Sequence, residues 1–129
     1  MVEFALVLPV LLLVLLAILK FGLLFNNYIT MTDAVRIGAR QLSVGRGSTD
    51  PCAAAVTATV NAATSINLTG DVTTSITNDS ANGTTCPTAT DLVSGNSAKV
   101  TATYPYSVSL MGISFFSGNL SASATERIE

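Results

Sequence analysis

The chain of 129 residues contains no histidine, no tryptophan and only two cysteines. Without histidine it cannot form a Ser-His-Asp triad or use an imidazole as general base, and most zinc sites lose their usual ligands. Its many serines therefore have no base to activate them, and its acidic residues show no spacing typical of paired catalytic carboxylates or metal-binding loops. We expect no enzymatic activity, no bound metal and no cofactor.

Charge is also scarce. Charged residues make up 11% of the chain, whereas about a quarter is usual for soluble domains. The six basic residues are scattered along the sequence, and the net charge is −2. A nucleic-acid-binding surface needs clustered cations to neutralise phosphates, so we expect no nucleic acid partner.

The apolar residues are concentrated at the N-terminus. Residues 4–19 contain no charged or hydrogen-bonding side chain, and the apolar run continues past Lys20 to Phe25. A helix over this segment would be about 33 Å long, enough to cross the roughly 30 Å hydrocarbon core of a bilayer. No basic residue precedes the run and no small-residue cleavage site follows it, so we expect a retained membrane anchor rather than a secretory signal peptide.

The same helix is predicted to continue beyond the anchor. Tyr28, Met31, Val35 and Leu42 form an apolar stripe at spacings typical of a helix, which is predicted to end at residues 45–48, Gly-Arg-Gly-Ser. Pro9 removes one backbone hydrogen bond and clashes with the preceding turn, which predicts a kink or an unwound turn near residues 5–9.

Glu3 is an acid placed beside a run of bilayer length. An unpaired carboxylate inside the hydrocarbon core costs about 2.5–3.5 kcal/mol. Glu3 could remain at the interface, where it favours the N-terminal end of the helix dipole. Alternatively it is a charge awaiting a partner, such as the α-amino group of a neighbouring subunit. The acid by itself favours the interfacial interpretation.

The remaining residues are polar and small. Asp50-Pro51 is typical of a helix start and predicts a short helix over about residues 51–64. Three segments alternate apolar and polar residues, as in an antiparallel sheet with one solvated face. They are centred on Val72–Ile76, Ala98–Tyr104 and Leu120–Ala124. Pro105 is expected to end the second strand or place it at an edge, and the link over residues 78–97 is expected to be a loop.

Cys52 and Cys86 are predicted to form a disulfide, because two cysteines in an exported domain most simply pair with each other. Closing a loop of this size stabilises the fold by roughly 3–4 kcal/mol in the chain-entropy model. The expected fold class is α+β and pilin-like. A long N-terminal helix, the anchor and filament core, occupies residues 1–44, and a small polar domain with a short helix and an antiparallel sheet occupies residues 45–129.

A second apolar segment, residues 108–116, is too short to span a bilayer. It could cap the core of the sheet, which we favour, or form a contact patch for another subunit. Leu, Met, Ile and two Phe together are rarely exposed on a soluble monomer.

The N-terminal residues resemble a known family. The string Val2-Glu3-Phe4-Ala5-Leu6-Val7-Leu8-Pro9, the following Leu-rich run, Phe21-Gly22 and the segment 34–40 are similar to the TadE-like proteins of tight-adherence (Tad, Flp, type IVc) pilus systems. Residues 123–129 are similar to the last strand of that family. Pilins usually carry their acid at the fifth mature position, whereas this chain has it at residue 3.

The resemblance implies how such a protein is processed, inserted into the membrane and assembled. Such subunits are made with a short leader that a prepilin peptidase removes, and they wait in the cytoplasmic (inner) membrane with the N-terminus inside and the C-terminal domain outside. The pilus assembly machinery then polymerises them into an extracellular helical filament of identical subunits.

We therefore expect a structural subunit of a Tad-like type IV pilus for surface attachment. The candidate assembly residues are Glu3, Phe4, Pro9, Tyr28, Met31, Val35 and Leu42. One alternative is a minor pseudopilin that primes or caps such a pilus. The other is a monomeric, single-pass membrane-anchored exported domain that binds a partner.

Overall fold

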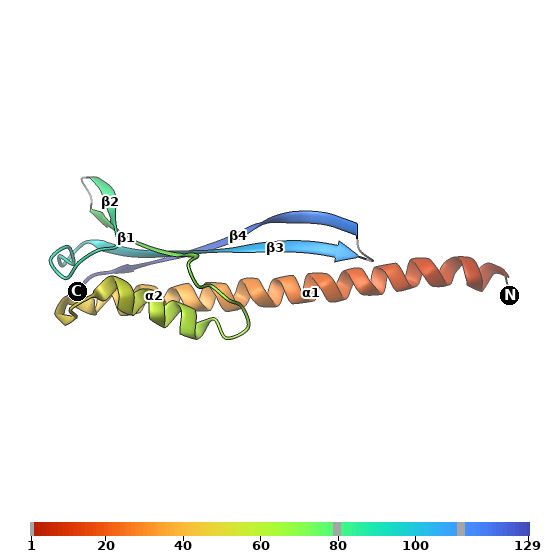
Figure 1. Ribbon diagram of the computed structural model, residues 1–129, viewed down its shortest axis with the longest axis horizontal. Helices are drawn as coiled ribbons and strands as arrows, with labels where there is room; N and C mark the ends of the chain where they lie inside the picture. The colour runs from red at the N-terminus through yellow and green to blue at the C-terminus, as the bar shows by residue number, and fades with distance from the viewer. Residues whose placement is uncertain (1, 79–80, 111–112) are drawn as a thin grey trace.

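The computed structural model describes the backbone of residues 2–78, 81–110 and 113–129, and their side chains except those of residues 2, 3, 5, 77, 78, 81–85, 110 and 113–115. A long helix runs along one face of an antiparallel sheet (Figure 1). The elements are α1 (Val2–Ser43), the 3-10 turn η1 (Gly45–Gly47), α2 (Pro51–Ala62), β1 (Val72–Asn78), β2 (Ala81–Thr85), β3 (Ser97–Leu110) and β4 (Ile113–Arg127). The predicted α+β class is confirmed.

Helix α1 is continuous over residues 2–43, although Pro9 lies inside it. Of the two outcomes expected near residues 5–9, the unwound turn is therefore absent from this described helix, whereas the kink stays a prediction. Proline at residue 9 removes only the N–H that would bond to the carbonyl of residue 5. The hydrogen bonds of the turns on either side are enough to keep the chain helical.

Helix α2 begins where the sequence predicts. Asp50 is its N-cap, with a side-chain oxygen accepting a hydrogen bond from the Ala53 N–H at 3.0 Å, and Pro51 follows in the first turn. Aspartate satisfies an otherwise free donor at this position, and proline has no donor to lose.

The sheet has the order β2-β1-β3-β4, with every neighbouring pair antiparallel. The three expected strands are present. The fourth strand, β2, lies within the link at residues 78–97 that was predicted to be a loop, so this part of the prediction is wrong. Strand β2 reads Ala-Asn-Gly-Thr-Thr, which lacks alternating apolar residues. Its pairing comes from the backbone, and next to it the Cys86 N–H donates to the Thr74 carbonyl at 3.0 Å.

Pro105 lies inside β3 and pairs with Asn119 of β4, so it does not end the strand. Instead it lies at a free edge, the other outcome expected for it. The nearby Thr103 donates its N–H to Asp71 on the β1 side. Because donors alternate along a strand, residue 105 faces the same side, beyond the last β1–β3 pair at Val72 and Ala102.

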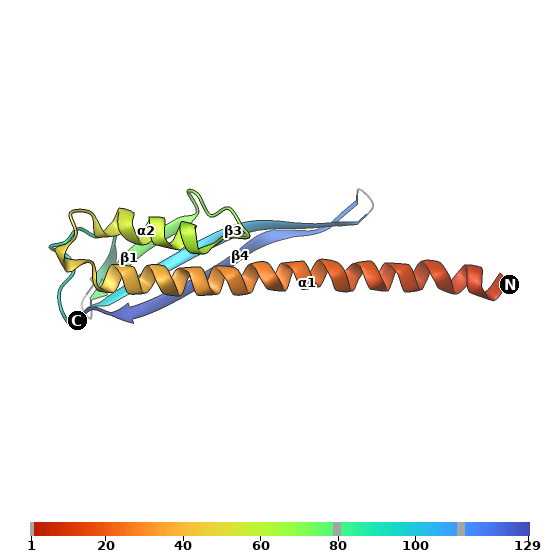
Figure 2. The same cartoon turned by 90° about the horizontal axis from the view of Figure 1, so that it is seen from below.

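Helices α1 and α2 cover one face of the sheet, and the other face is solvated (Figures 1 and 2). The covered face is built from small or apolar side chains, and its buried members are Thr74, Ile76, Ala98, Val100, Ala102 and Ala122. Thr73, Ser121, Ser123 and Thr125 alternate with them and are exposed. The predicted one-sided sheet is confirmed.

The core lies between the sheet and the C-terminal half of α1. One stripe of that helix is fully buried and consists of Met31, Ala34, Val35, Ala39 and Leu42. Leu68, Leu92 and Ile128 close the core from the loops and the last residues of the chain. The second half of α1 is thus part of the folded domain, and we call residues 31–129 the head.

Helices α1 and α2 pack most closely at Gly38. A Cβ atom at this position would overlap the Thr59 hydroxyl and lie 3.2 Å from the Ala55 carbonyl oxygen. Thr59 is itself fully buried, and its hydroxyl donates to that carbonyl at 2.8 Å. Glycine is therefore needed at residue 38 because α2 occupies the space of a side chain.

We predict that Gly38→Ala destabilises the protein by about 1–3 kcal/mol, because overpacking separates the two helices. Gly22 of the same helix is the matched control, since a Cβ there would meet nothing within 4 Å. Gly22→Ala should be neutral or slightly stabilising, because alanine favours a helix. Urea unfolding of the full chain in detergent measures both. Equal effects of the two substitutions would contradict the close contact at Gly38.

The predicted disulfide between Cys52 and Cys86 is present, with a Cα–Cα distance of 5.2 Å. It joins the first turn of α2 to the end of β2 and thus ties the helical layer to the edge of the sheet. The Cys52 sulfur is buried and lies 3.1 Å from the Thr74 hydroxyl oxygen.

Replacing both cysteines by serine should lower the free energy of unfolding by about 3–4 kcal/mol, because the unfolded chain regains the entropy of the open loop. The measurement is urea unfolding of the oxidised protein and of the variant in the same detergent. An unchanged unfolding midpoint would show that the bond does not constrain the head.

A candidate assembly surface

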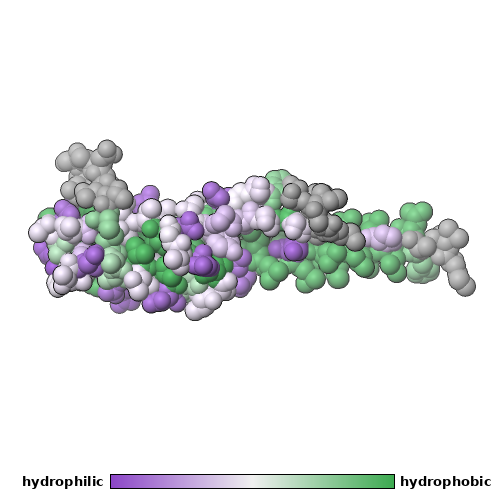
Figure 3. Space-filling view, in the orientation of Figure 1, coloured by the Kyte–Doolittle hydropathy of each residue, from purple (hydrophilic) through white to green (hydrophobic). Residues whose placement is uncertain are grey.

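The N-terminal half of α1 is an uncovered apolar rod. Fifteen large apolar side chains between residues 4 and 25 are exposed, beginning with Phe4 at 81% and ending with Phe25 at 64%. They surround the helix rather than forming one stripe, and the part of the rod that is visible in Figure 3 projects from the head as a mainly hydrophobic surface. By length and composition α1 is able to cross a membrane.

The free energy at stake is large. Burying one large apolar side chain contributes about 1.5–3 kcal/mol, so fifteen of them amount to more than roughly 20 kcal/mol. A typical domain is stable by only about 5–15 kcal/mol. The rod therefore requires a surrounding of lipid or protein.

Strands β3 and β4 extend beyond β1 toward this rod. Their paired ends, residues 104–110 and 113–120, form a two-stranded ribbon that we call the arm. The arm runs along α1 and diverges from it near its tip (Figure 2). An isolated two-stranded ribbon is only marginally stable in water, so the arm needs a surface to rest on.

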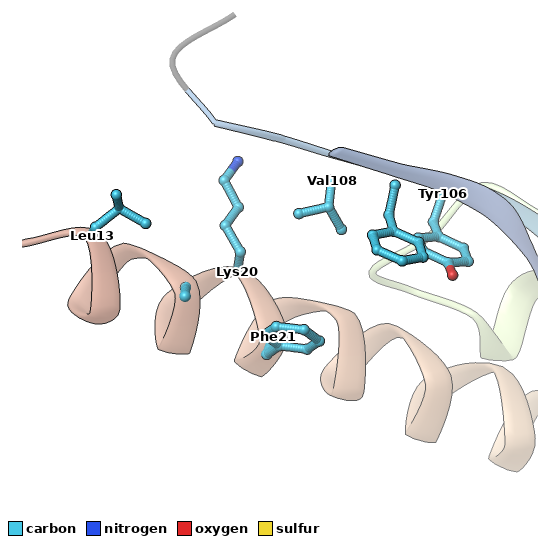
Figure 4. A pocket seen from close by; sticks show the side chains of 7 residues that line it. Leu13, Lys20, Phe21, Tyr106 and Val108 are labelled. Atoms are coloured by element: carbon cyan, nitrogen blue, oxygen red, sulfur yellow. The ribbon is translucent and has the colours of Figure 1, made fainter. Parts of the chain in front are cut away.

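Between the arm and α1 lies a groove with a volume of about 470 Å³. It is lined by Leu13, Ala17, Lys20 and Phe21 of α1 and by Tyr106, Val108 and Phe116 of the arm. Lys20 extends from α1 toward the underside of the arm (Figure 4). Its ammonium group and the Tyr106 hydroxyl are the polar groups among these side chains. The groove is thus an apolar surface with one cation in it.

The described part of the apolar segment 108–116 belongs to this groove. Val108 lines it, and Phe116 also lines it while remaining 72% exposed. Neither residue belongs to the buried core, so these two do not have the core-capping role that we favoured. Residues 111 and 112, and the side chains of residues 110 and 113–115, lie outside the described part of the chain.

Tyr106 is held in place across the arm. It pairs with Gly118 of β4, where an added Cβ would approach the tyrosine ring within 3.2 Å. The ring therefore covers the glycine, an arrangement that supports a ribbon which has no third strand. One wall of the groove is stabilised in this way.

The candidate assembly residues separate into two groups. Phe4 and Pro9 lie on the exposed rod, and Tyr28 is 43% exposed, beside Leu120 of the arm. Met31, Val35 and Leu42 are fully buried inside the head, where they contact their own subunit. Glu3 lies in the first turn of α1, and its side chain is outside those that the structure describes.

None of the seven residues that line the groove was among the candidate assembly residues from the sequence, although the segment 108–116 was considered as a contact patch. A signal for Lys20 was available, because it is the one charged residue between residues 4 and 25. No local pattern could have placed Val108 and Phe116 beside residues 13–21, since that contact depends on the length of the β3–β4 ribbon.

Elsewhere the titratable groups serve the fold. The Thr88 N–H and hydroxyl donate to the Asp91 carboxylate at 2.9 and 2.7 Å, and these hydrogen bonds lower the pKa of Asp91. They stabilise an exposed turn. Within the described residues, no group of three His, Cys, Asp or Glu side chains is placed to hold a metal ion.

The position of the arm conflicts with a bilayer around residues 4–25. Only residues 2–12 of α1 precede the groove, which is about 16 Å of helix against a hydrocarbon core of roughly 30 Å. The arm would lie in that core with unpaired backbone groups along its edges, which hydrocarbon does not tolerate. A subunit whose helix spans a membrane must therefore move the arm away from α1.

We predict that, in lipid vesicles, a spin label at Ser117→Cys of the arm is accessible to water whereas one at Val14→Cys is accessible to lipid. Power-saturation measurements with polar and apolar relaxing agents distinguish the two environments. A label at Ser123→Cys on the solvated face of the sheet is the control. If the label at residue 117 lies as deep as the one at residue 14, the arm stays against α1 in the bilayer.

Comparisons with known proteins agree with the N-terminal features. Residues 1–40 match the family model described as TadE-like protein, which confirms the resemblance seen in the sequence over the apolar rod and most of the buried stripe. The match does not extend to residues 123–129. No curated protein and no solved structure shows significant similarity to the chain.

Proposed function

We propose that this chain is a structural, non-catalytic subunit of a type IV (Tad-like) pilus, and that it polymerises through the N-terminal half of α1 into a filament for surface attachment. The observation that carries the proposal is the apolar rod of residues 4–25, most of whose large side chains are exposed, whereas one stripe of the second half of the same helix is buried in the head. The TadE-like match over residues 1–40 supports it.

The rod suits two successive surroundings. In the cytoplasmic membrane, lipid covers it, with the N-terminus inside and the head outside. In the filament, the rods of other copies cover it. The large free energy of apolar burial is retained in both, so transfer between them needs only a modest driving force. A prepilin peptidase and the pilus assembly machinery are the partners that this route requires.

The head suits dense packing on the outside of such a filament. Its solvated sheet face is mainly Ser and Thr, with Lys99 and Arg127 as cations, so the charge that neighbouring heads must accommodate there is small. The disulfide between Cys52 and Cys86 stabilises a small domain in an oxidising surrounding.

A minor pseudopilin that primes or caps the pilus is the second candidate, because the match to TadE-like protein does not distinguish it from a bulk subunit. The two roles differ in copy number. A bulk subunit is the main protein of the fibre, whereas a minor subunit is present in a few copies.

The test is the protein composition of fibres sheared from the cells that make this chain. We expect a dominant species near the chain mass of 13.3 kDa. A trace amount would favour the minor pseudopilin. A chain that remains monomeric in the membrane fraction and is absent from the fibres would favour a membrane-anchored binding domain and contradict the filament role.

A further inference from the structure

We infer that Lys20 of one subunit pairs with Glu3 of another, whose first helical turn occupies the groove between α1 and the arm. The inference rests on the proposed filament function and specifies the contact by which it is achieved. It assigns the groove to a second copy of this chain.

The first step concerns the cation. In the part of the chain that the structure describes, the one salt bridge joins Arg36 to Asp33 at 3.8 Å, so no described carboxylate lies within that reach of the Lys20 ammonium. Water solvates Lys20 in an isolated subunit. When the rod is buried among other rods, that water is removed, and an unpaired buried charge becomes strongly unfavourable.

The second step concerns the available acid. Glu3 is the only acidic residue before Asp33, so residues 2–25 carry one cationic side chain, Lys20, and one acidic side chain, Glu3. They are 17 residues apart in one continuous helix, which corresponds to about 26 Å along the axis. Within one subunit they cannot meet, because the helix between them is rigid.

The third step is the arrangement of two copies. If a parallel neighbour is displaced along the helix axis by about 26 Å, its Glu3 lies level with Lys20. Both charges are then neutralised in one contact, and every subunit in the row repeats it. Because the two surfaces in contact are different, the contact repeats from copy to copy and forms a filament instead of a closed dimer.

The fourth step is the fit of the groove. Val2, Phe4 and Ala5 next to Glu3 in the sequence are apolar, and Phe4 is 81% exposed, so the first turn of α1 combines one acid with apolar residues. The groove offers the complement: apolar walls from Leu13, Phe21 and Val108 on both sides of one ammonium. Charge and apolar character both favour this occupant.

The test uses full-length variants in the cells that form the fibres. Lys20→Glu and Glu3→Lys should each reduce the yield of sheared fibres more than about tenfold, because each leaves two like charges together in the groove. The double variant, with both charges exchanged, should recover most of the yield. Exchanging Asp33 and Arg36, an exposed pair inside one head, is the matched control and should leave the yield unchanged.

A second measurement identifies the contact directly. The native cysteines are paired with each other. In fibres of the Glu3→Cys/Lys20→Cys variant, oxidation should therefore link subunits into ladders through the new cysteines. Glu3→Cys/Asn26→Cys, with the second cysteine moved away from the groove, should not form ladders. Membrane insertion and an intact Cys52–Cys86 bond establish that each variant is folded.

The outcomes separate this inference from the proposed function. Abundant wild-type fibres combined with normal yield from Lys20→Glu, no recovery in the double variant, or no ladders would overturn the Lys20–Glu3 contact and leave the filament role intact. If Lys20→Gln lowers membrane retention while the Glu3 variants assemble normally, Lys20 binds a lipid phosphate and the inference is wrong. Absence of the wild-type chain from the fibres would overturn both.

Discussion

The contact of α1 with α2 at Gly38 governs the arrangement of the rest of the molecule. The missing side chain lets the Ala55 carbonyl and Thr59 approach the backbone of α1. Ala98 and Ala102 of the sheet are fully buried in the same core as the stripe of α1. The stripe from residue 31 to residue 42 is therefore held firmly in the head. Since α1 is one continuous helix, its direction over residues 4–25 is fixed as well.

This rigid helix joins two regions that differ in how their apolar side chains are buried. The head is satisfied by its own core and its disulfide, whereas the rod exposes far more apolar surface than a monomer in water could sustain. The arm lies where the two regions meet. It lies across the groove from residues 13–21 of α1, a length that a bilayer would have to cover. Lipid and the arm therefore cannot both occupy the space beside these residues.

This geometry suggests a role for the charged side chains Lys20 and Glu3. A single cation in an apolar groove and a single acid 17 residues earlier are unremarkable in an isolated subunit, where water reaches both. In a bundle of rods each would be a buried unpaired charge, and a regular axial displacement of copies removes both problems together. If Lys20 and Glu3 are unpaired at most axial displacements and paired at one, they specify how the copies align. Buried polar residues specify the alignment of coiled coils in the same way.

The sequence by itself determined the features that depend on local patterns. These are the extent of α1, the Asp50 cap of α2, the alternation of the three main strands and the cysteine pair, because periodicity, capping and a single possible pairing are readable from neighbouring residues. Only the tertiary structure decided that Met31, Val35 and Leu42 face their own head, that β2 pairs with β1, and that the arm places Val108 and Phe116 beside Lys20. An apolar stripe is the same in sequence whether a neighbour or the chain itself covers it. Contacts between residues far apart in the chain decide which surface covers the stripe, and these contacts cannot be predicted from local sequence patterns.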